Sequence, residues 1–561
     1  MDSPIVTQLF RQLFRHGHPA CHTRRNLTNL ASALHHSRQR QVRIHNNNTS
    51  SRALSSGTRG AISQSEKERQ WQQRNDTFPI ERSDELQRYP TVTARDLRKH
   101  TERPRRVKML MRDFIEDSLY NPHYGYFSKQ VVIFTPGEPF DFGSIRDELE
   151  FHALLSQRYR EFEDALDQKK GPGGTAAAPS DTRQLWYTPT ELFRPYYGEA
   201  VARYLCENYR QTTFPYHDLI IYEMGAGRGT LMLNILDYIR DVDPEVYERT
   251  RYKIIEISPN LAGVQESSLR AGSGSGAAGA GADAGAALES SASARGHRDR
   301  VDIINKSVFD WKDTVPSPCF FLAFEVFDNF AHDVIRYDLR TEEPLQGTVV
   351  IDAEGDFYQT FSPVADPVIK RFLRLRHSAT EGVYPLPYHS RSGLGMDPQE
   401  PWWRRSLRGL RGMGGGGGGV GAPGGLSQPE YVPTRLMDFF EVLERYFPNH
   451  QLVASDFHSL PDATRGLNAP IVQTRYQRRP VPVTTPLVHQ GYFDIMFPTD
   501  FDTMEAIYRS VTGKLSRVRS HEDFMRSWAY VEDCETRNGE NPLLSWYNNA
   551  SVMMTWNYRM M

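Results

Sequence analysis

The chain is 561 residues long, with 24% charged and 39% hydrophobic residues, a composition typical of a globular protein with one large catalytic domain or two smaller ones. Its formal net charge of −2 at pH 7 gives no indication of nucleic-acid binding or of attachment to an anionic membrane. Because no apolar run approaches the roughly 20 residues that span a bilayer, we expect no transmembrane segment.

The first sixty residues are basic and almost free of acids. Asp2 is the only acidic residue before Glu66, whereas arginines recur throughout. Within residues 9–14 (LFRQLF), apolar pairs four positions apart place an apolar stripe on one face of a helix. Residues 1–65 are therefore predicted to be a presequence for import into the mitochondrial matrix. A basic disordered tail without a targeting role is the alternative.

The four cysteines, Cys21, Cys206, Cys319 and Cys534, lie far apart and form no C-x-x-C pair. This spacing favours neither a disulfide scaffold nor a structural zinc site, and it fits a reducing compartment. We predict no bound metal.

Stretches dominated by glycine, alanine and serine interrupt the sequence at residues 171–180, 271–294 and 412–425. Segments of this composition bury too little apolar surface to offset the entropy of ordering them. Each is predicted to be a flexible surface insertion in a scaffold that continues on either side.

Strand and helix patterns alternate from residue 217 onward. The predicted strands cover residues 218–224, 252–257, 301–304, 319–324 and 451–455, and the predicted helices cover residues 230–240, 260–270 and 434–447. This alternation predicts an α/β fold, in which helices cover a parallel sheet and ligands bind at the carboxyl ends of the strands.

The first of these strands runs into the sequence EMGAGRGT, which then opens a helix. Glycines there let the chain turn sharply and let backbone N–H groups approach a ligand. They are Gly225, Gly227 and Gly229, spaced G-x-G-x-G. A dinucleotide site needs G-x-G-x-x-G, and Thr230 stands where its third glycine would be. Glu223, two positions before the first glycine, suits a cationic ligand. The loop therefore indicates an S-adenosylmethionine site, with NAD as the less favoured alternative.

Two further positions belong to the predicted cofactor site. Glu256 ends the second strand, where a carboxylate can accept both ribose hydroxyls of an adenosyl group. NAD would use the same carboxylate, so Glu256 does not discriminate between the two cofactors. Asp310 and Trp311 follow the third strand, where the adenine is expected. A helix cap and a packed indole are the alternative for that pair.

The fourth strand ends in FEVFD, where a polar cluster would face the donor methyl group. A guanidinium acceptor needs carboxylates that hold it bidentately, and aromatic walls tolerate positive charge. Glu325 and Asp328 are the candidate catalytic carboxylates, with Phe324 and Phe327 as walls. Capping of the following helix is the alternative role of the two acids.

Several motifs spread over the chain belong together, namely those at residues 119–127 (LYNPHYGYF), 187–192 (YTPTEL), 197–199 (YGE), 223–230 (EMGAGRGT) and 324–328 (FEVFD). Taken together they resemble the MidA family, which includes the mitochondrial protein arginine methyltransferases of complex I assembly. The likeness covers roughly residues 105–515, and the tyrosine-glycine box at its start is the most specific part.

This resemblance implies a Rossmann-like, class I S-adenosylmethionine-dependent methyltransferase core with an N-terminal helical extension. It implies an arginine acceptor in a protein, such as a matrix-arm subunit of complex I, and no nucleic-acid partner. The residues carried over are the cofactor contacts Gly225, Gly227, Gly229 and Glu256, and the pocket residues Tyr126, Thr188, Pro189 and Glu191.

The predicted domain organisation follows from these motifs. Residues 66–200 form a segment over the cofactor site. Residues 201–515 form the methyltransferase domain, with insertions at 271–296 and 412–425. Residues 516–561 form a helical tail, because residues 541–547 carry an apolar stripe at helical spacing.

The acceptor side departs from the family pattern. Thr190 lengthens the second motif by one residue, Phe324 stands where the family has asparagine, and Ala331 and Asp333 stand where it has proline and histidine. His458, after a later strand, is a possible base, although a structural role is the usual one for a lone loop histidine. An assembly factor that binds S-adenosylmethionine without turnover is therefore the alternative function.

Overall fold

The computed structural model describes six stretches of the chain, namely residues 83–129, 131–168, 183–270, 296–380, 425–461 and 468–559. The predicted presequence and the low-complexity stretches at 171–180, 271–294 and 412–424 lie outside the described residues. Within the described stretches, no helix combines the length and the apolar character needed to cross a membrane.

The largest sheet has seven strands in the order β6-β5-β4-β7-β12-β17-β16. They are β4 (Leu219–Met224), β5 (Thr250–Ile255), β6 (Val301–Ile304), β7 (Cys319–Phe324), β12 (His450–Phe457), β16 (Lys514–Ser520) and β17 (Ala550–Arg559). Neighbours pair in parallel except β17, which is antiparallel to both β12 and β16. Counted along the chain, the order is 3-2-1-4-5-7-6, so it reverses between β4 and β7. The predicted Rossmann-like fold is confirmed, and its ligand crevice belongs at that reversal.

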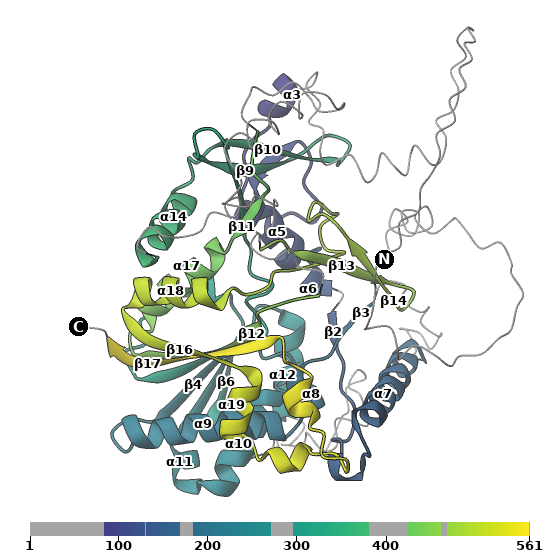
Figure 1. Cartoon of the computed structure of the whole chain (residues 1–561), viewed down its shortest axis with the longest axis vertical. Coiled ribbons are helices and arrows are strands. Elements are labelled where there is room, and N and C mark those ends of the chain that lie inside the picture. The colour runs from purple at the N-terminus through teal and green to yellow at the C-terminus, as the bar shows by residue number, and fades with distance from the viewer. Residues whose placement is uncertain are drawn as a thin grey trace, which may run out of the picture. The chain divides into compact units, whose positions relative to one another are not determined.

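Helices cover both faces of this sheet. One face packs on α9 (Tyr196–Thr212) and α10 (Thr230–Val242), and the other on α14 (Pro367–Ala379), α17 (Thr434–Tyr446) and α18 (Phe501–Thr512) (Figure 1). Ile221 and Phe320 belong to the first core, whereas Tyr222 and Phe321 belong to the second. Apolar residues at consecutive positions are typical of strands that are buried on both faces.

Three smaller sheets occur among the described residues. A five-stranded sheet contains β1 (Val107–Leu110), β8 (Asp333–Tyr337), β9 (Pro344–Ile351), β10 (Phe357–Pro363) and β11 (Glu430–Val432). A three-stranded sheet contains β13 (Ile471–Tyr476), β14 (Arg479–Val483) and β15 (Asp494–Met496), and β2 (Val131–Ile133) pairs with β3 (Gln184–Trp186). The five-stranded and three-stranded sheets share one hydrophobic core with α5 (Met111–Tyr120), to which Phe114, Val349 and Ile495 contribute.

The segment before the methyltransferase domain is mixed rather than helical. Its helices are α3 (Ser83–Gln87), α4 (Ala94–Leu97), α5, α6 (Tyr126–Lys129), α7 (Glu148–Gln168) and α8 (Pro189–Leu192), but it also supplies β1, β2 and β3. Strand β1 pairs with β9, more than two hundred positions later, so this segment is built into the fold. The remaining helices are α11 (Pro244–Glu248), α12 (Pro259–Arg270), α19 (His521–Trp528) and α20 (Pro542–Ser545).

The prediction of a helical tail over residues 516–561 is wrong. This segment supplies most of β16 and all of β17, and β17 lies between β12 and β16 in the main sheet. The apolar stripe at 541–547 forms only the short helix α20. Val552, Met553 and Met554 are buried consecutively, because an inserted strand is covered on both faces. The sheet therefore extends beyond residue 515.

Two distant loops cross in backbone contact beside the main sheet. Gly491 has a φ of +83°, and a Cβ atom there would lie 1.7 Å from the carbonyl oxygen of Tyr124. Gly125 is confined by its own turn, because its Cβ atom would lie 2.5 Å from the backbone nitrogen of Asn121. Only glycine permits this approach, which joins the tyrosine-glycine box of residues 119–127 to the loop before β15.

We therefore expect Gly491→Ala to lower the free energy of unfolding by several kcal/mol, whereas Gly513→Ala costs only about 1 kcal/mol. Both glycines have positive φ, but a Cβ atom at Gly513 meets nothing within 4 Å, so the difference isolates the steric term. Urea denaturation of the two variants measures it. Equal losses would mean that the crossing is not tight in solution.

Candidate active site

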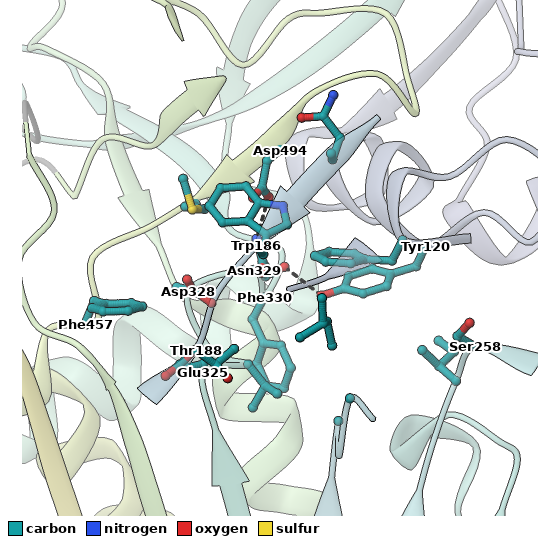
Figure 2. Close-up of a pocket in the computed structure, with 18 of the residues that line it drawn as sticks. Tyr120, Trp186, Thr188, Ser258, Glu325, Asp328, Asn329, Phe330, Phe457 and Asp494 are labelled. Atoms are coloured by element: carbon teal, nitrogen blue, oxygen red, sulfur yellow. Dashed lines mark hydrogen bonds between the residues drawn. The ribbon is translucent and has the colours of Figure 1, made fainter. Parts of the chain in front are cut away.

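A cavity of about 840 Å³ lies at the carboxyl ends of β4, β5 and β7. Its walls come from the glycine loop after β4, the end of β5 and the turn after β7, together with residues of α5, β3, β13 and β15. Figure 2 shows Glu325, Asp328 and Asp494 among the side chains that line it. The cavity therefore occupies the place where the strand order reverses, which is where open α/β sheets bind ligands.

The glycine loop forms one wall of the cavity. Gly225 and Gly227 line it, with φ values of +73° and +55°. A Cβ atom at Gly225 would lie 2.7 Å from Cγ1 of Val326, and one at Gly227 would lie 2.8 Å from Cδ1 of Ile133. Gly229 does not line the cavity; its φ of +83° turns the chain into α10. Side chains at the first two positions would fill space that the backbone leaves free for a ligand.

Glu256 lies beside this loop, as predicted. Its Oε1 accepts a hydrogen bond from the backbone nitrogen of Ser258 at 2.8 Å, and its Oε2 accepts one from Nε2 of Gln265 at 3.3 Å. The same Nε2 donates to the carbonyl of Gly227 at 2.9 Å, which couples the carboxylate to the loop. Burial raises the pKa of Glu256 to about 6. A buried carboxylate at the end of the second strand fits an adenosyl ribose.

Glu223, predicted as a cofactor contact, does not line the cavity. Its side chain is buried, and Tyr252 donates a hydrogen bond to its Oε2 at 2.8 Å. Burial raises the pKa of this carboxyl group to about 7. Because Glu223 lies within a strand rather than after it, its side chain points into the core of the fold. The structure gives it a packing role.

Asp310 and Trp311 also lie outside the cavity lining. Asp310 forms an exposed ion pair with Arg98 at 2.8 Å, and Trp311 is buried with its Nε1 donating to the carbonyl of Asp313. Two earlier residues, Val308 and Phe309, line the cavity instead, because a 3₁₀ turn over Val308–Asp310 directs the later side chains away.

The residues expected from the second motif divide into lining and supporting positions. Thr188 lines the cavity and caps α8, where it accepts a hydrogen bond from the backbone nitrogen of Glu191. Glu191 lies behind the wall and accepts a hydrogen bond from Oγ1 of Thr230 at 2.5 Å, at the start of α10. Tyr126 is fully buried, and its hydroxyl accepts a hydrogen bond from Nε1 of Trp186, which does line the cavity.

Glu325 and Asp328 also line the cavity. Glu325 has a φ of +53°, and its backbone nitrogen donates to the carbonyl of Ser455 at 2.8 Å. The backbone nitrogens of Phe327 and Asp328 donate to Oδ2 of Asp456 at 2.8 and 3.3 Å. The carboxylate of Asp456 thus holds the turn that presents both candidate catalytic side chains.

These two carboxyl groups have no cationic partner in the part of the chain that the structure describes. Oδ1 of Asp328 is buried without a hydrogen-bond partner. Burial, reinforced by repulsion from Asp456, raises the pKa of Glu325 and of Asp328 well above the usual range. Such a cluster is costly to ionise unless a cationic ligand enters the cavity.

Sequence reasoning missed several lining residues of the acceptor end. Asp494 and Asn329 line the cavity, as do Tyr120 and Phe127, whose rings stack with centroids 5.4 Å apart. The tyrosine-glycine box is recognisable in the sequence, but its pattern does not state which side chain faces a ligand.

Two positions at which the sequence departs from the family pattern lie away from the cavity, as does His458. Phe324 packs on Tyr197, with ring centroids 6.2 Å apart, and Asp333 accepts hydrogen bonds from Arg112 and Thr434. His458 is exposed and bonds to Ser551, which fits its structural alternative. Among the described residues, no group of three histidine, cysteine or acidic side chains could hold a metal ion.

The fold and the cavity together define a Rossmann-like methyltransferase with a glycine loop at its cofactor end. The model of a family of S-adenosyl-L-methionine-dependent methyltransferases matches residues 200–519, more than half of the chain. The chain belongs to this family, the MidA family whose motifs it carries, and S-adenosylmethionine is its methyl donor.

Its relatives include a protein of Schizosaccharomyces pombe named protein arginine methyltransferase NDUFAF7 homolog, mitochondrial. That protein is 24% identical over 435 residues, which cover 75% of this chain and 80% of the relative. Crystal structures of two proteins of one superfamily from Burkholderia thailandensis are similar to this chain, with 13% and 14% sequence identity to it and a TM-score of 0.45 each. Each comparison covers 86% of this chain and 95% of the other, and one of the two proteins is bound to S-adenosyl-homocysteine.

The buried position of Glu223 yields a prediction about stability. Between pH 4.5 and about 7 the folded chain retains a proton that the unfolded chain releases, so this group makes the free energy of unfolding fall as pH rises. Glu223→Gln removes that loss. We therefore expect the free energy of unfolding of the variant, relative to that of the wild type, to rise by up to about 3 kcal/mol between pH 4.5 and pH 8.

Denaturation at both pH values measures the gain, and titration with S-adenosyl-homocysteine provides the control. We expect unchanged affinity, since Glu223 does not line the cavity. A large loss of affinity in a folded variant would restore the original prediction that this residue contacts the cofactor.

Proposed function

We propose that this methyltransferase methylates an arginine side chain of a protein in the mitochondrial matrix, and that its substrate is a subunit of the matrix arm of complex I undergoing assembly. Two observations support the setting: the relative from S. pombe is named as a mitochondrial protein arginine methyltransferase, and residues 1–65 have the composition of a presequence.

The observation that carries an arginine acceptor is the unpaired pair of acids after β7. Glu325 and Asp328 share one cavity with the glycine loop, and neither has a cationic partner among the described residues. A guanidinium is planar, carries five N–H donors and stays charged, so it matches carboxylates bidentately. Such an acceptor would supply a positive charge beside these two acids, because the cations that line the cavity pair with other acids, namely Lys306, Arg435, Arg475 and Arg478 with Asp313, Glu116, Glu163 and Asp164.

In the same cavity, Gly225, Gly227 and Glu256 would hold the cofactor. When bound, S-adenosylmethionine supplies an electrophilic methyl group on a sulfonium. Glu325 and Asp328 accept N–H bonds from the guanidinium and so fix the direction in which one of its nitrogens approaches. After methylation that nitrogen releases a proton, and one of the two carboxylates takes it.

The cofactor end yields a pH prediction. Only the ionised carboxylate of Glu256 can accept from both ribose hydroxyls, and its pKa is raised to about 6. We therefore expect the affinity for S-adenosyl-homocysteine to fall below pH 6, by about tenfold per pH unit. Glu256→Gln should bind about tenfold or more weakly at pH 8 and lack this decline. Isothermal titration at several pH values measures both, and a Gln variant with the wild-type profile would assign the effect to another group.

The acceptor end yields an activity prediction. We expect Glu325→Ala to lower methyl transfer at least about a hundredfold, because a charged hydrogen-bond partner of the transferring nitrogen is lost, while binding of S-adenosyl-homocysteine persists. Transfer of radiolabelled methyl to a mitochondrial complex I fraction measures it.

The matched control is Glu342→Ala. Glu342 also has a positive φ, of +60°, but lies on an exposed turn away from the cavity. Its removal should leave transfer unchanged. Wild-type protein that binds the cofactor without any transfer would favour the alternative, an assembly factor without turnover, and the packing of Phe324 into the core would then be part of that loss.

A further inference from the structure

A third acid, Asp494 in β15, reaches the acceptor end from a distant part of the sequence. Nδ2 of Asn329 donates to Oδ1 of Asp494 at 2.8 Å and to the carbonyl of Ile495 at 3.1 Å. The backbone nitrogen of Phe497 donates to the carbonyl of Asp328 at 2.7 Å. These bonds fix β15 against the turn after β7, so that the carboxylate of Asp494 lies near that of Asp328.

Asp494 is only 3% exposed, and its small exposed part belongs to the cavity wall. No lysine or arginine pairs with it within the described stretches. Burial raises its pKa to about 7, even though Asn329 donates to it. Asp494 also contributes to the raised pKa of Asp328, after burial and Asp456, so the two carboxyl groups are close enough to repel each other.

We propose that Asp494 is a third carboxylate of the acceptor site and binds the guanidinium of the substrate arginine directly, together with Glu325 and Asp328. This inference rests on the arginine acceptor proposed above and adds a binding residue to it.

The geometry explains why a third acid is useful. A guanidinium is planar, and its N–H donors point outward along three edges of the group. Two carboxylates that follow the same strand approach it from one direction. Asp494 comes from a different sheet, so it can accept from a side that Glu325 and Asp328 leave open. Tyr120, whose hydroxyl donates to the carbonyl of Asn329 at 3.2 Å, contributes an aromatic wall that tolerates positive charge (Figure 2).

The competing explanation is that Asp494 merely anchors Asn329. The variant Asp494→Asn separates the two roles, because its side-chain oxygen still accepts from Asn329 while its charge is gone. The conservative variant Asp494→Glu keeps the charge on a longer side chain. Asp113→Asn is the matched control, since Asp113 is half-buried and has a pKa raised to about 6, but does not line the cavity.

The test is titration of each protein, saturated with S-adenosyl-homocysteine, with the peptides acetyl-Gly-Arg-Gly-amide and acetyl-Gly-citrulline-Gly-amide. Citrulline has nearly the shape of arginine without its charge. We expect wild type and Asp113→Asn to prefer the arginine peptide. Asp494→Asn should bind it about ten- to a hundredfold more weakly, with unchanged affinity for the citrulline peptide and for S-adenosyl-homocysteine, and Asp494→Glu should recover part of the loss.

Three outcomes overturn the inference in distinguishable ways. A wild type that does not discriminate between the peptides overturns both this inference and the arginine acceptor. Preserved discrimination in Asp494→Asn overturns the role of Asp494 and leaves the arginine acceptor in place. Equal weakening toward both peptides in Asp494→Asn and Asp494→Glu assigns Asp494 to the support of Asn329.

Discussion

The parallel pairing of β4 with β5 on one side and β7 on the other is the constraint on which the site depends. Met224 is level with Ile255 and with Ala323, so the three strands end at one edge of the sheet. Gly225 directly follows Met224, and Glu256 directly follows Ile255. Glu325 comes two residues after Ala323. The glycine turn, the carboxylate proposed to bind the ribose and the carboxylate proposed to bind the acceptor are therefore brought together by sheet register alone.

The sheet edge provides only part of the cavity, and the opposite walls come from segments far apart in the sequence. α5 and β3 precede the first strand of the main sheet, whereas β13 and β15 follow its fifth strand. Their close approach depends on Gly491, at which the chain passes against the backbone of Tyr124. The acceptor end is thus shaped by long-range packing, while the cofactor end is shaped by local turns.

That difference explains what could be predicted from the sequence. The glycine loop and Glu256 were predictable, because each directly follows a strand whose apolar pattern is clear. Asp310 and Trp311 were misplaced, since a single 3₁₀ turn decides which residue after β6 faces the ligand. Asp494 could not be placed in the site from the sequence. It lies close to Asp328 because of hydrogen bonds between segments that are 165 residues apart. The helical tail was predicted from the apolar stripe at 541–547, which forms only the short helix α20. The apolar run of β17 is buried on both faces and has no alternation that would mark it as a strand.

The position of β17 has a consequence for how the chain reaches its folded state. Strand β16 joins the main sheet only through β17, and β17 pairs with β12, about a hundred residues earlier. Pairing between strands so far apart in the sequence is slow, because the intervening chain loses conformational entropy before the stabilising contacts form. Until β17 inserts, β12 is an uncovered apolar edge, the kind that templates association with other chains. The step of folding most vulnerable to aggregation is therefore the last one at this edge, after the cofactor loop can already have formed.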